Sequence, residues 1–292
     1  RLVGSEMCIR DSYIIKTEFK MLTIDKVKKA ELLLKDVVRK TDLIYATALS
    51  KNADIYLKSE NLQKTGSFKV RGAYAKIAQL SAEQKKRGII ACSAGNHAQG
   101  VALSAQKSGI ESTIFIPSTA PISKIEATKS YGAHIRLVDG VYDDAYNEAV
   151  KFQKETGAEF IHPFDDIEVI AGQGTIALEI LEQLPEVEAI IVPIGGGGLI
   201  SGIAYTIKML KPDCKVYGVQ AAGAGSMYHS MELHKRTELP SVHTFADGTA
   251  VKMPGENTFA LCEKYVDEIV TVTDDEIATA VLTLCLLYTS PS

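Results

Sequence analysis

The sequence predicts an α/β fold built on open, mostly parallel sheets flanked by helices. Short apolar runs, each bounded by Gly, Pro or Asp, have the length and composition of buried strands. Helix-length segments separate them, and this alternation is typical of a doubly wound sheet. No internal repeat or low-complexity segment interrupts the alternation. The expected strands are 112–117, 134–139, 159–164, 189–194 and 215–220, and the helices between them include 142–156, 169–184 and 199–210.

The composition argues against several classes of protein. The 292 residues are 46% hydrophobic and 23% charged, which suffices for one large core or two small ones. A net charge of -4 gives no electrostatic footprint for nucleic acid. The most apolar stretch, 189–205, is interrupted by Pro193 and five glycines, so no membrane span is expected. Because Cys92, Cys214 and Cys262 form no C-x-x-C pair, neither a disulfide framework nor a metal site is indicated, and a reducing cytoplasm is the simplest compartment.

The two ends of the chain differ from the rest. Residues 1–12 and 285–292 resemble translated vector or adapter sequence rather than a secretion signal, since no basic region or small-residue cleavage site accompanies them. Met21 is the expected start, with ordinary frayed termini as the alternative. The amphipathic segment that begins at Asp274 is interpreted as a helix that the last residues cut short.

A lysine lies in the first turn of a predicted helix. Ser67 is a plausible N-cap, and Lys69 follows two residues later. The positive end of the helix dipole disfavours the ammonium form of Lys69 by about 0.3 to 1 kcal/mol, which favours the free amine that attacks a carbonyl carbon. A solvated surface lysine is the alternative, and position alone favours it. The apolar residues that predict the helix are Val70, Ala73, Tyr74, Ile77 and Leu80.

A polar turn joins the predicted strand 88–92 to the predicted helix 98–107. Such a turn leaves backbone N–H groups unpaired at the helix start, which suits a carboxylate. Ordinary N-capping by Ser93 or Asn96 is an equally good reading of these residues alone. His97 is interpreted as a packed loop histidine rather than a general base, and Cys92 as a buried strand-end residue rather than a nucleophile.

Four consecutive glycines follow the predicted strand 190–194 and open a helix near Leu199. Without side chains in the turn, several N–H groups can converge on an anion such as a phosphate. A dinucleotide site is disfavoured, because its fingerprint wants an acidic residue at the end of the next strand, where Gln220 stands. A purely structural turn is also disfavoured, because glycine costs conformational entropy without any packing return. The glycines are Gly195, Gly196, Gly197 and Gly198.

Three motifs in this order resemble the fold-type II pyridoxal-phosphate (PLP) enzymes of the tryptophan synthase beta-like family, and among them the threonine dehydratases (threonine ammonia-lyases). The motifs are Thr65–Gly72 (TGSFKVRG), Ser93–His97 (SAGNH) and Gly195–Leu199 (GGGGL). The resemblance covers about 21–284 and implies two lobes, each an open, twisted, mostly parallel sheet flanked by helices. The larger lobe is expected at about 21–84 and 162–284 and the smaller at about 85–161, with the cofactor between them. Because the family continues beyond this point, the chain is expected to be a fragment that lacks any regulatory domain.

The resemblance also implies roles for individual residues. Lys69 would be the catalytic residue that holds PLP covalently and removes the α-proton of the substrate. The loop Gly195, Gly196, Gly197, Gly198 and Leu199 would bind the phosphate of PLP. The loop Ser93, Ala94, Gly95, Asn96 and His97 would bind the substrate carboxylate, and the Asn96 side chain the 3′-oxygen of PLP. The segment 244–250 would face the cofactor, and the partner of the pyridine nitrogen would lie beyond the end of the chain.

The implied reaction is PLP-dependent β-elimination, which converts L-threonine to 2-oxobutanoate and ammonia and L-serine to pyruvate, with PLP as the electron sink. A serine or threonine racemase, another fold-type II lyase and an inactive PLP-binding fragment are the alternatives. Two residues favour elimination: Ala94 stands where serine racemases carry an acid/base serine, and Gln220 stands where they carry an acidic metal ligand. A homo-oligomer is expected by the same resemblance.

Overall fold

The computed structural model describes residues 21–288. The predicted tail 1–12 and residues 289–292 lie outside the described residues, whereas residues 285–288, predicted to belong to a tail, continue the last helix. The helices are α2 (Ile24–Leu34), α3 (Lys69–Ala78), α4 (Ala82–Arg87), α5 (Asn96–Ser108), α6 (Ile122–Lys129), α7 (Tyr142–Thr156), α8 (Ile167–Gln183), α9 (Gly198–Leu210), α10 (Ser226–Glu232), α11 (Glu256–Tyr265) and α12 (Asp274–Tyr288), with short 3-10 turns at Glu60–Leu62, Ala222–Ala224 and Asp247–Thr249.

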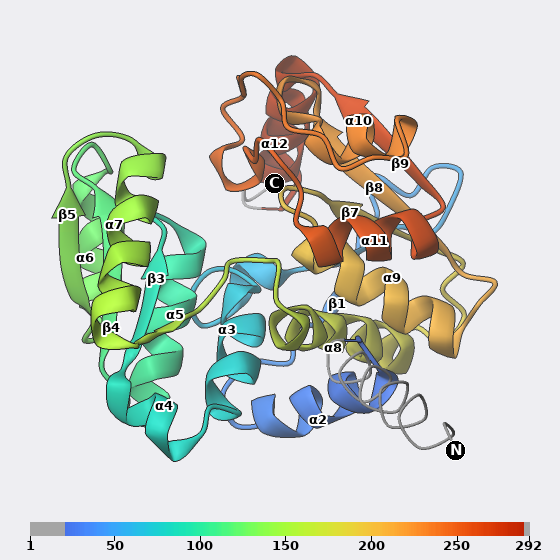
Figure 1. The fold of residues 1–292 in the computed structure, drawn as a ribbon. Helices are drawn as coiled ribbons and strands as arrows, with labels where there is room; N and C mark the ends of the chain where they lie inside the picture. The colour runs from blue at the N-terminus through green and yellow to red at the C-terminus, as the bar shows by residue number, and fades with distance from the viewer. Residues whose placement is uncertain (1–20, 289–292) are drawn as a thin grey trace, which may run out of the picture.

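Two parallel sheets form the framework of the described residues (Figure 1). The first has the order β5 (His134–Val138), β4 (Ser112–Pro117), β3 (Ile89–Cys92) and β6 (Glu159–Phe160). The second has the order β7 (Ala189–Pro193), β8 (Lys215–Ala221) and β9 (Glu268–Val272). A short antiparallel pair, β1 (Leu43–Tyr45) and β2 (Tyr56–Lys58), was not expected from the sequence.

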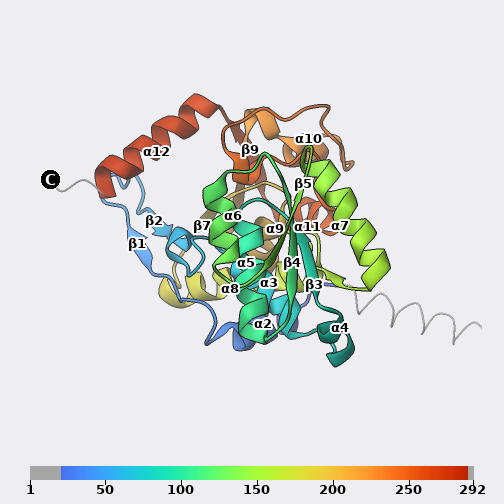
Figure 2. The same cartoon turned by 90° about the vertical axis from the view of Figure 1, so that its left-hand side faces the viewer.

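Helices cover both faces of the first sheet, as Figure 2 shows with α7 on one side and α5 and α6 on the other. Apolar side chains from β3 and β4 alternate between these two layers: Ile90, Cys92 and Phe115 face α7, whereas Ile89 and Ile114 face α5. All strands of this sheet fall within 85–161, the range expected for the smaller lobe. The lobe boundaries themselves stay a prediction.

Helix α8 connects the two halves of the molecule through paired glycines. A Cβ at Gly172 would lie 2.7 Å from the Cα of Gly72 on α3, and a Cβ at Gly202 on α9 would lie 2.6 Å from the N of Gly174 on α8. The backbones of α3, α8 and α9 therefore touch, which only glycine permits at this separation. Because α3 begins at Lys69 and α9 begins at Gly198, α8 fixes the two helix starts relative to one another.

The predicted elements mostly match those observed, and the strand at 159–164 is the main error. Strand β6 ends at Phe160, because the ring of His162 accepts hydrogen bonds from the backbone N–H groups of Phe164 and Asp165 and turns the chain away from the sheet. Pro163 also lacks an N–H for the ladder. Along the described part of the chain, no helix combines the length and the apolar character that crossing a membrane requires.

Candidate functional site

Lys69 is the first residue of α3, and its side chain is largely shielded from solvent. Its Nζ donates a hydrogen bond to the carbonyl oxygen of Pro163 at 2.8 Å. Burial lowers the pKa of the Lys69 amine to about 8. The alternative of a solvated surface lysine is therefore wrong, and desolvation is the cause of the lowered pKa.

The expected N-cap of this helix is also wrong. Phe68 is the N-cap residue, with helical dihedrals and no side-chain cap, and Ser67 lies one residue earlier. The Ser67 hydroxyl still accepts from the Lys69 N–H at 3.4 Å, a long contact. Ser67 is buried within the motif instead of closing the helix from outside.

Helix α5 packs directly against the backbone of Lys69. A Cβ at Gly100 would lie 3.0 Å from the carbonyl carbon of Lys69 and 3.2 Å from its Cβ. Glycine at this position lets α5, the helix that follows the polar turn 93–97, approach the backbone of the lysine closely. Gly100 was not identified from the sequence, because a lone glycine inside a predicted helix gives no sign of what it touches.

The turn before α5 carries unpaired hydrogen-bond donors. The N-cap is Gly95, and the hydroxyl of Ser93 accepts from the Gly95 N–H at 3.2 Å rather than from the helix. Asn96 is the first residue of α5, two residues earlier than predicted, and makes no cap either. N-capping by Ser93 or Asn96 is thus wrong. Within residues 21–288, the N–H groups of Ala94, Asn96, His97 and Ala98 and the side-chain amide of Asn96 bond to no other residue.

The side chain of His97 is packed in the interior and hydrogen-bonded there. It is buried in the first turn of α5, with Nε2 2.8 Å from the carbonyl oxygen of Ile161. Burial, together with the charge of Lys69, lowers the pKa of His97 to about 3, so the neutral ring donates its Nε2–H to that carbonyl. Cys92 is likewise buried at the end of β3, and burial raises the pKa of its thiol to about 12. Both residues are placed as the packed residues that the sequence indicated.

The glycine loop forms the start of α9. Gly197 is the N-cap with φ +95°, a left-handed conformation that favours glycine, and Gly198 is the first helical residue. Among the described residues, nothing accepts a hydrogen bond from the N–H groups of 195–200, although Gly196, Gly197 and Gly198 are buried. Buried N–H groups without partners at a helix start suit an anion, and a phosphate fits this donor set.

The same glycines have a packing function, so the expectation that glycine brings no packing return in this turn is wrong. A Cβ at Gly196 would lie 2.5 Å from ring carbons of Phe164, and a Cβ at Gly198 would lie 2.9 Å from the Phe164 Cα. A Cβ at Gly197 would lie 2.6 Å from the Met227 side chain. The loop is therefore glycine-rich for close packing as well as for open donors.

The structure also places the predicted segment 244–250 and Gln220. A Cβ at Gly195 would lie 3.1 Å from the Cα of Thr249, so the segment 244–250 lies against the glycine loop. Gln220 is buried, and its amide accepts from the Tyr228 N–H at 2.8 Å and donates to the Ala224 carbonyl at 3.3 Å. Gln220 thus anchors the first turn of α10.

Arg71, part of the first motif, is fully buried, and its importance was missed. Its guanidinium bonds both oxygens of Glu60, at 2.8 and 2.9 Å, and both oxygens of Glu179, at 2.6 and 3.0 Å. Lys58 completes the cluster with a 2.6 Å bond to Glu179. This neutral set of charges holds the first turn of α3 against α8.

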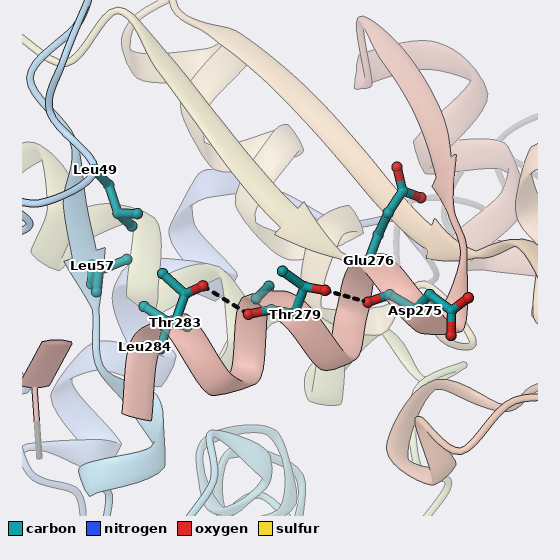
Figure 3. Close-up of a pocket in the computed structure, with 8 residues that line it drawn as sticks. Leu49, Leu57, Asp275, Glu276, Thr279, Thr283 and Leu284 are labelled. Carbon is teal, nitrogen blue, oxygen red and sulfur yellow. Dashed lines mark hydrogen bonds between the residues drawn. The ribbon is translucent and has the colours of Figure 1, made fainter. Parts of the chain in front are cut away.

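An apolar groove lies elsewhere, between α12 and the segment that contains Leu49 and Leu57 (Figure 3). Thr279 and Thr283 line it, and their hydroxyls bond to carbonyls one turn earlier on α12. None of the candidate site residues lines this groove.

Comparison with known proteins agrees with the fold and with the family that the sequence resembles. The chain is 54% identical over 266 residues to an L-threonine ammonia-lyase of Thermotoga maritima, covering 90% of this chain and 66% of the relative. Among solved structures, threonine deaminase isoform 2 of Solanum lycopersicum has a TM-score of 0.89 at 39% identity, covering 91% of this chain and 74% of that one. Maize serine racemase has a TM-score of 0.88 at 38% identity, covering 91% and 80%.

The chain spans about two thirds of the length of the curated relatives that it matches first. The expected α/β fold with helix-flanked parallel sheets is confirmed by these structural neighbours. The family model of pyridoxal-phosphate dependent enzymes matches residues 34–288, so the chain belongs to this family, whose cofactor is PLP.

Proposed function

We propose that this chain carries the catalytic region of a threonine ammonia-lyase, which converts L-threonine to 2-oxobutanoate and ammonia and L-serine to pyruvate and ammonia. The observation that carries the proposal is the half-buried Lys69 amine at the start of α3, whose pKa desolvation lowers to about 8. An amine with this pKa is a usable base near neutral pH. The relatives from Thermotoga maritima and Geobacter sulfurreducens are both L-threonine ammonia-lyases, which supports the choice of substrate.

Residues of this chain supply the donors that PLP and the substrate require. The N–H groups of Gly195 to Leu199, unpaired among the described residues, would hold the phosphate, and the free amide of Asn96 would be available for the 3′-oxygen of the ring. PLP, when bound, supplies the electron sink that acidifies the α-carbon of the substrate. The N–H groups of Ala94, Asn96 and His97 bind the substrate carboxylate and orient the α-hydrogen toward Lys69.

Lys69 is the base of the reaction. Its neutral amine removes the α-proton and later gives it up to solvent, while the β-hydroxyl takes up one proton and departs as water. The released enamine tautomerises to an imine, and water replaces the imine nitrogen to give the 2-oxo acid and ammonia. The net change is loss of ammonia from the amino acid with no oxidation. The carbonyl of Pro163, which accepts a hydrogen bond from Lys69 Nζ, keeps the amine at the site before the reaction.

Elimination is proposed over racemisation. Ala94 has no hydroxyl to return a proton from the opposite side, and the amide of Gln220 is occupied by the Ala224 carbonyl and the Tyr228 N–H. The similarity to maize serine racemase keeps racemisation as the second candidate. L-Serine separates the two, because the lyase gives pyruvate and the racemase gives D-serine.

The assignment of Lys69 is tested by borohydride reduction of the protein mixed with PLP, followed by peptide mass spectrometry. We expect the phosphopyridoxyl group on Lys69, its loss in Lys69→Ala, and its retention in Lys64→Ala, a control at an exposed lysine five residues away. A label on another lysine contradicts the assignment. If no lysine is labelled, the chain is an inactive fragment of the family.

We also propose that the protein is a homo-oligomer in a reducing cytoplasm. The support for the compartment is that Cys92, Cys214 and Cys262 are buried free thiols. Sedimentation of the purified protein tests the oligomeric state.

A further inference from the structure

The segment between β6 and α8 contacts His97, Lys69 and the glycine loop of the candidate site, and also α11. The carbonyl of Ile161 accepts from His97, and the carbonyl of Pro163 accepts from Lys69. Phe164 lies against the glycine loop, and the carboxylate of Asp165 accepts from the first N–H groups of α11 at 2.9 to 3.3 Å. One short segment thus links the lysine, the glycine loop and α11.

His162 gives this segment its shape. Its Nδ1 accepts the backbone N–H of Asp165 at 2.8 Å and that of Phe164 at 3.3 Å. The same ring packs edge-to-face on Phe164, with centroids 4.7 Å apart. A side-chain acceptor that bonds the N–H groups two and three residues later closes a tight turn.

The turn decides where two neighbouring groups point. Pro163 lies inside it, and its carbonyl meets the Lys69 amine at 2.8 Å. Phe164 follows, and its ring occupies the space that a Cβ at Gly196 would need. Opening the turn would therefore move the partner of the amine and the wall of the glycine loop together.

The arrangement requires a neutral imidazole. A proton on Nδ1 would face two N–H donors, so protonation and the turn exclude one another. Burial lowers the pKa of His162, and the charge of Lys69 acts in the same direction, whereas Asp165 and Asp166 act against them. His97, the other ring near this segment, is neutral as well.

We propose that His162 is a positioning residue: by holding the 162–165 turn closed, it keeps the Pro163 carbonyl on the Lys69 amine and the Phe164 ring on the glycine loop. The distance between the reacting amine and the phosphate donors is then set by His162, which itself need touch neither substrate nor cofactor. The proposal rests on Lys69 and the glycine loop being the PLP site put forward above.

Two substitutions separate the acceptor atom from the bulk of the ring. His162→Asn keeps an oxygen that can accept from the N–H groups two and three residues later, as asparagine does in Asx turns. His162→Leu keeps apolar volume and removes the acceptor. His134→Leu, at an exposed histidine on β5, is the matched control.

The readout is the rate at which Lys69 is modified, which a merely structural role would leave unchanged in protein that remains folded. PLP is added to the cofactor-free protein, samples are quenched with borohydride at intervals, and the Lys69 peptide is quantified by mass spectrometry. We expect His162→Leu to slow capture at Lys69 at least tenfold, and His162→Asn and His134→Leu to stay within about threefold of the unmodified protein. Capture by His162→Leu at the unmodified rate, or equal slowing in the Asn and Leu variants, overturns the proposal.

A second measurement does not depend on the folding of any variant. ¹⁵N NMR of the histidine rings in the unmodified, cofactor-free protein reports which ring nitrogen carries the proton. We expect His162 as the neutral tautomer with the proton on Nε2 at pH 7, and a protonated Nδ1 contradicts the proposal. If the unmodified protein captures no PLP at Lys69, the proposed function fails instead, whatever the tautomer.

Discussion

The Nζ of Lys69 donates a hydrogen bond to the carbonyl oxygen of Pro163 at 2.8 Å, across 94 positions of the sequence. A carbonyl is a neutral partner, so it holds the amine without stabilising the ammonium form as a carboxylate would. The relationship joins the first turn of α3 to the exit of β6. It places a reactive amine where burial, rather than a charge, sets its pKa.

The first prediction concerns the pH dependence of Lys69. Its pKa is lowered from 10.5 to about 8 by burial, so half of the amine is free near pH 8, and the rate of its acylation by acetic anhydride should be half-maximal there. Between pH 8 and 10.5 this lysine binds more protons in the unfolded chain than in the folded one. Its contribution therefore raises the free energy of unfolding as pH rises through this range. Mass spectrometry of the acylated peptide gives the midpoint. A midpoint above pH 10 would mean that Lys69 is solvated.

The second prediction concerns Arg71, whose guanidinium is paired with Glu60 and Glu179. Arg71→Leu leaves the two carboxylates with Lys58 as the remaining cation of the cluster and should lower the free energy of unfolding by about 3 to 5 kcal/mol. Urea unfolding of the cofactor-free protein measures the loss. The control is Lys40→Leu, which removes an exposed pair with Glu182 and should cost no more than about 1 kcal/mol.

An Arg71→Lys variant refines the same experiment. Lysine keeps the charge but cannot bond both oxygens of two carboxylates at once, so an intermediate loss is expected. Equal stability of the Leu variant and the unmodified protein would show that this buried cluster contributes nothing to holding α3.

Much of the framework could be predicted because its signals are local. The strand at 112–117 and the helix at 142–156 have the predicted bounds. An apolar run and an amphipathic segment are each recognisable in the sequence, and residues such as Gly and Pro near their ends mark where they stop. Long-range contacts have no such signal. A histidine within an apolar run looked like part of a strand, and only the fold reveals that His162 closes a turn that faces Lys69.

The candidate site was only partly predictable for the same reason. Lys69, the polar turn 93–97 and the glycine loop could be found as motifs, because unusual residues stand together in the sequence. The helix pairing at Gly100 and the burial of Arg71 could not, since glycine in a helix and arginine in a motif are each compatible with a solvated surface. Phe164 gave no signal, because its partners at Gly196 and Gly198 lie on another helix start.

The third prediction concerns the choice of reaction and follows from Ala94. The unmodified protein with PLP and L-serine should give pyruvate with negligible D-serine. Ala94→Ser adds a hydroxyl to the polar turn 93–97, the proposed substrate-binding loop, and should raise the ratio of D-serine to pyruvate severalfold, whereas Ala53→Ser, at an exposed position, should not change it. Chiral chromatography measures the ratio. Substantial D-serine from the unmodified protein would identify a racemase.

The fourth prediction separates the two functions of the glycine loop. A Cβ at Gly196 would lie 2.5 Å from ring carbons of Phe164, so Gly196→Ala should destabilise the protein by about 1 to 3 kcal/mol through overpacking. Phe164→Leu in the same chain makes room for the added methyl and should recover most of that stability. Thermal melting of the two single variants and the double variant, all without cofactor, gives the coupling.

Affinity for PLP then tests the second function of the glycine loop, which is to bind the phosphate. If the N–H groups of the loop hold the phosphate, the double variant keeps these donors and should bind PLP more tightly than Gly196→Ala alone. Gly66→Ala serves as the comparison for Gly196→Ala. The φ of +70° at Gly66 makes the substitution strain the backbone, but a Cβ there meets nothing within 4 Å, so this variant shows the effect of strain without overpacking. A double variant that regains stability but not PLP affinity would mean that Phe164 itself, and not only the open glycine backbone, forms part of the phosphate site.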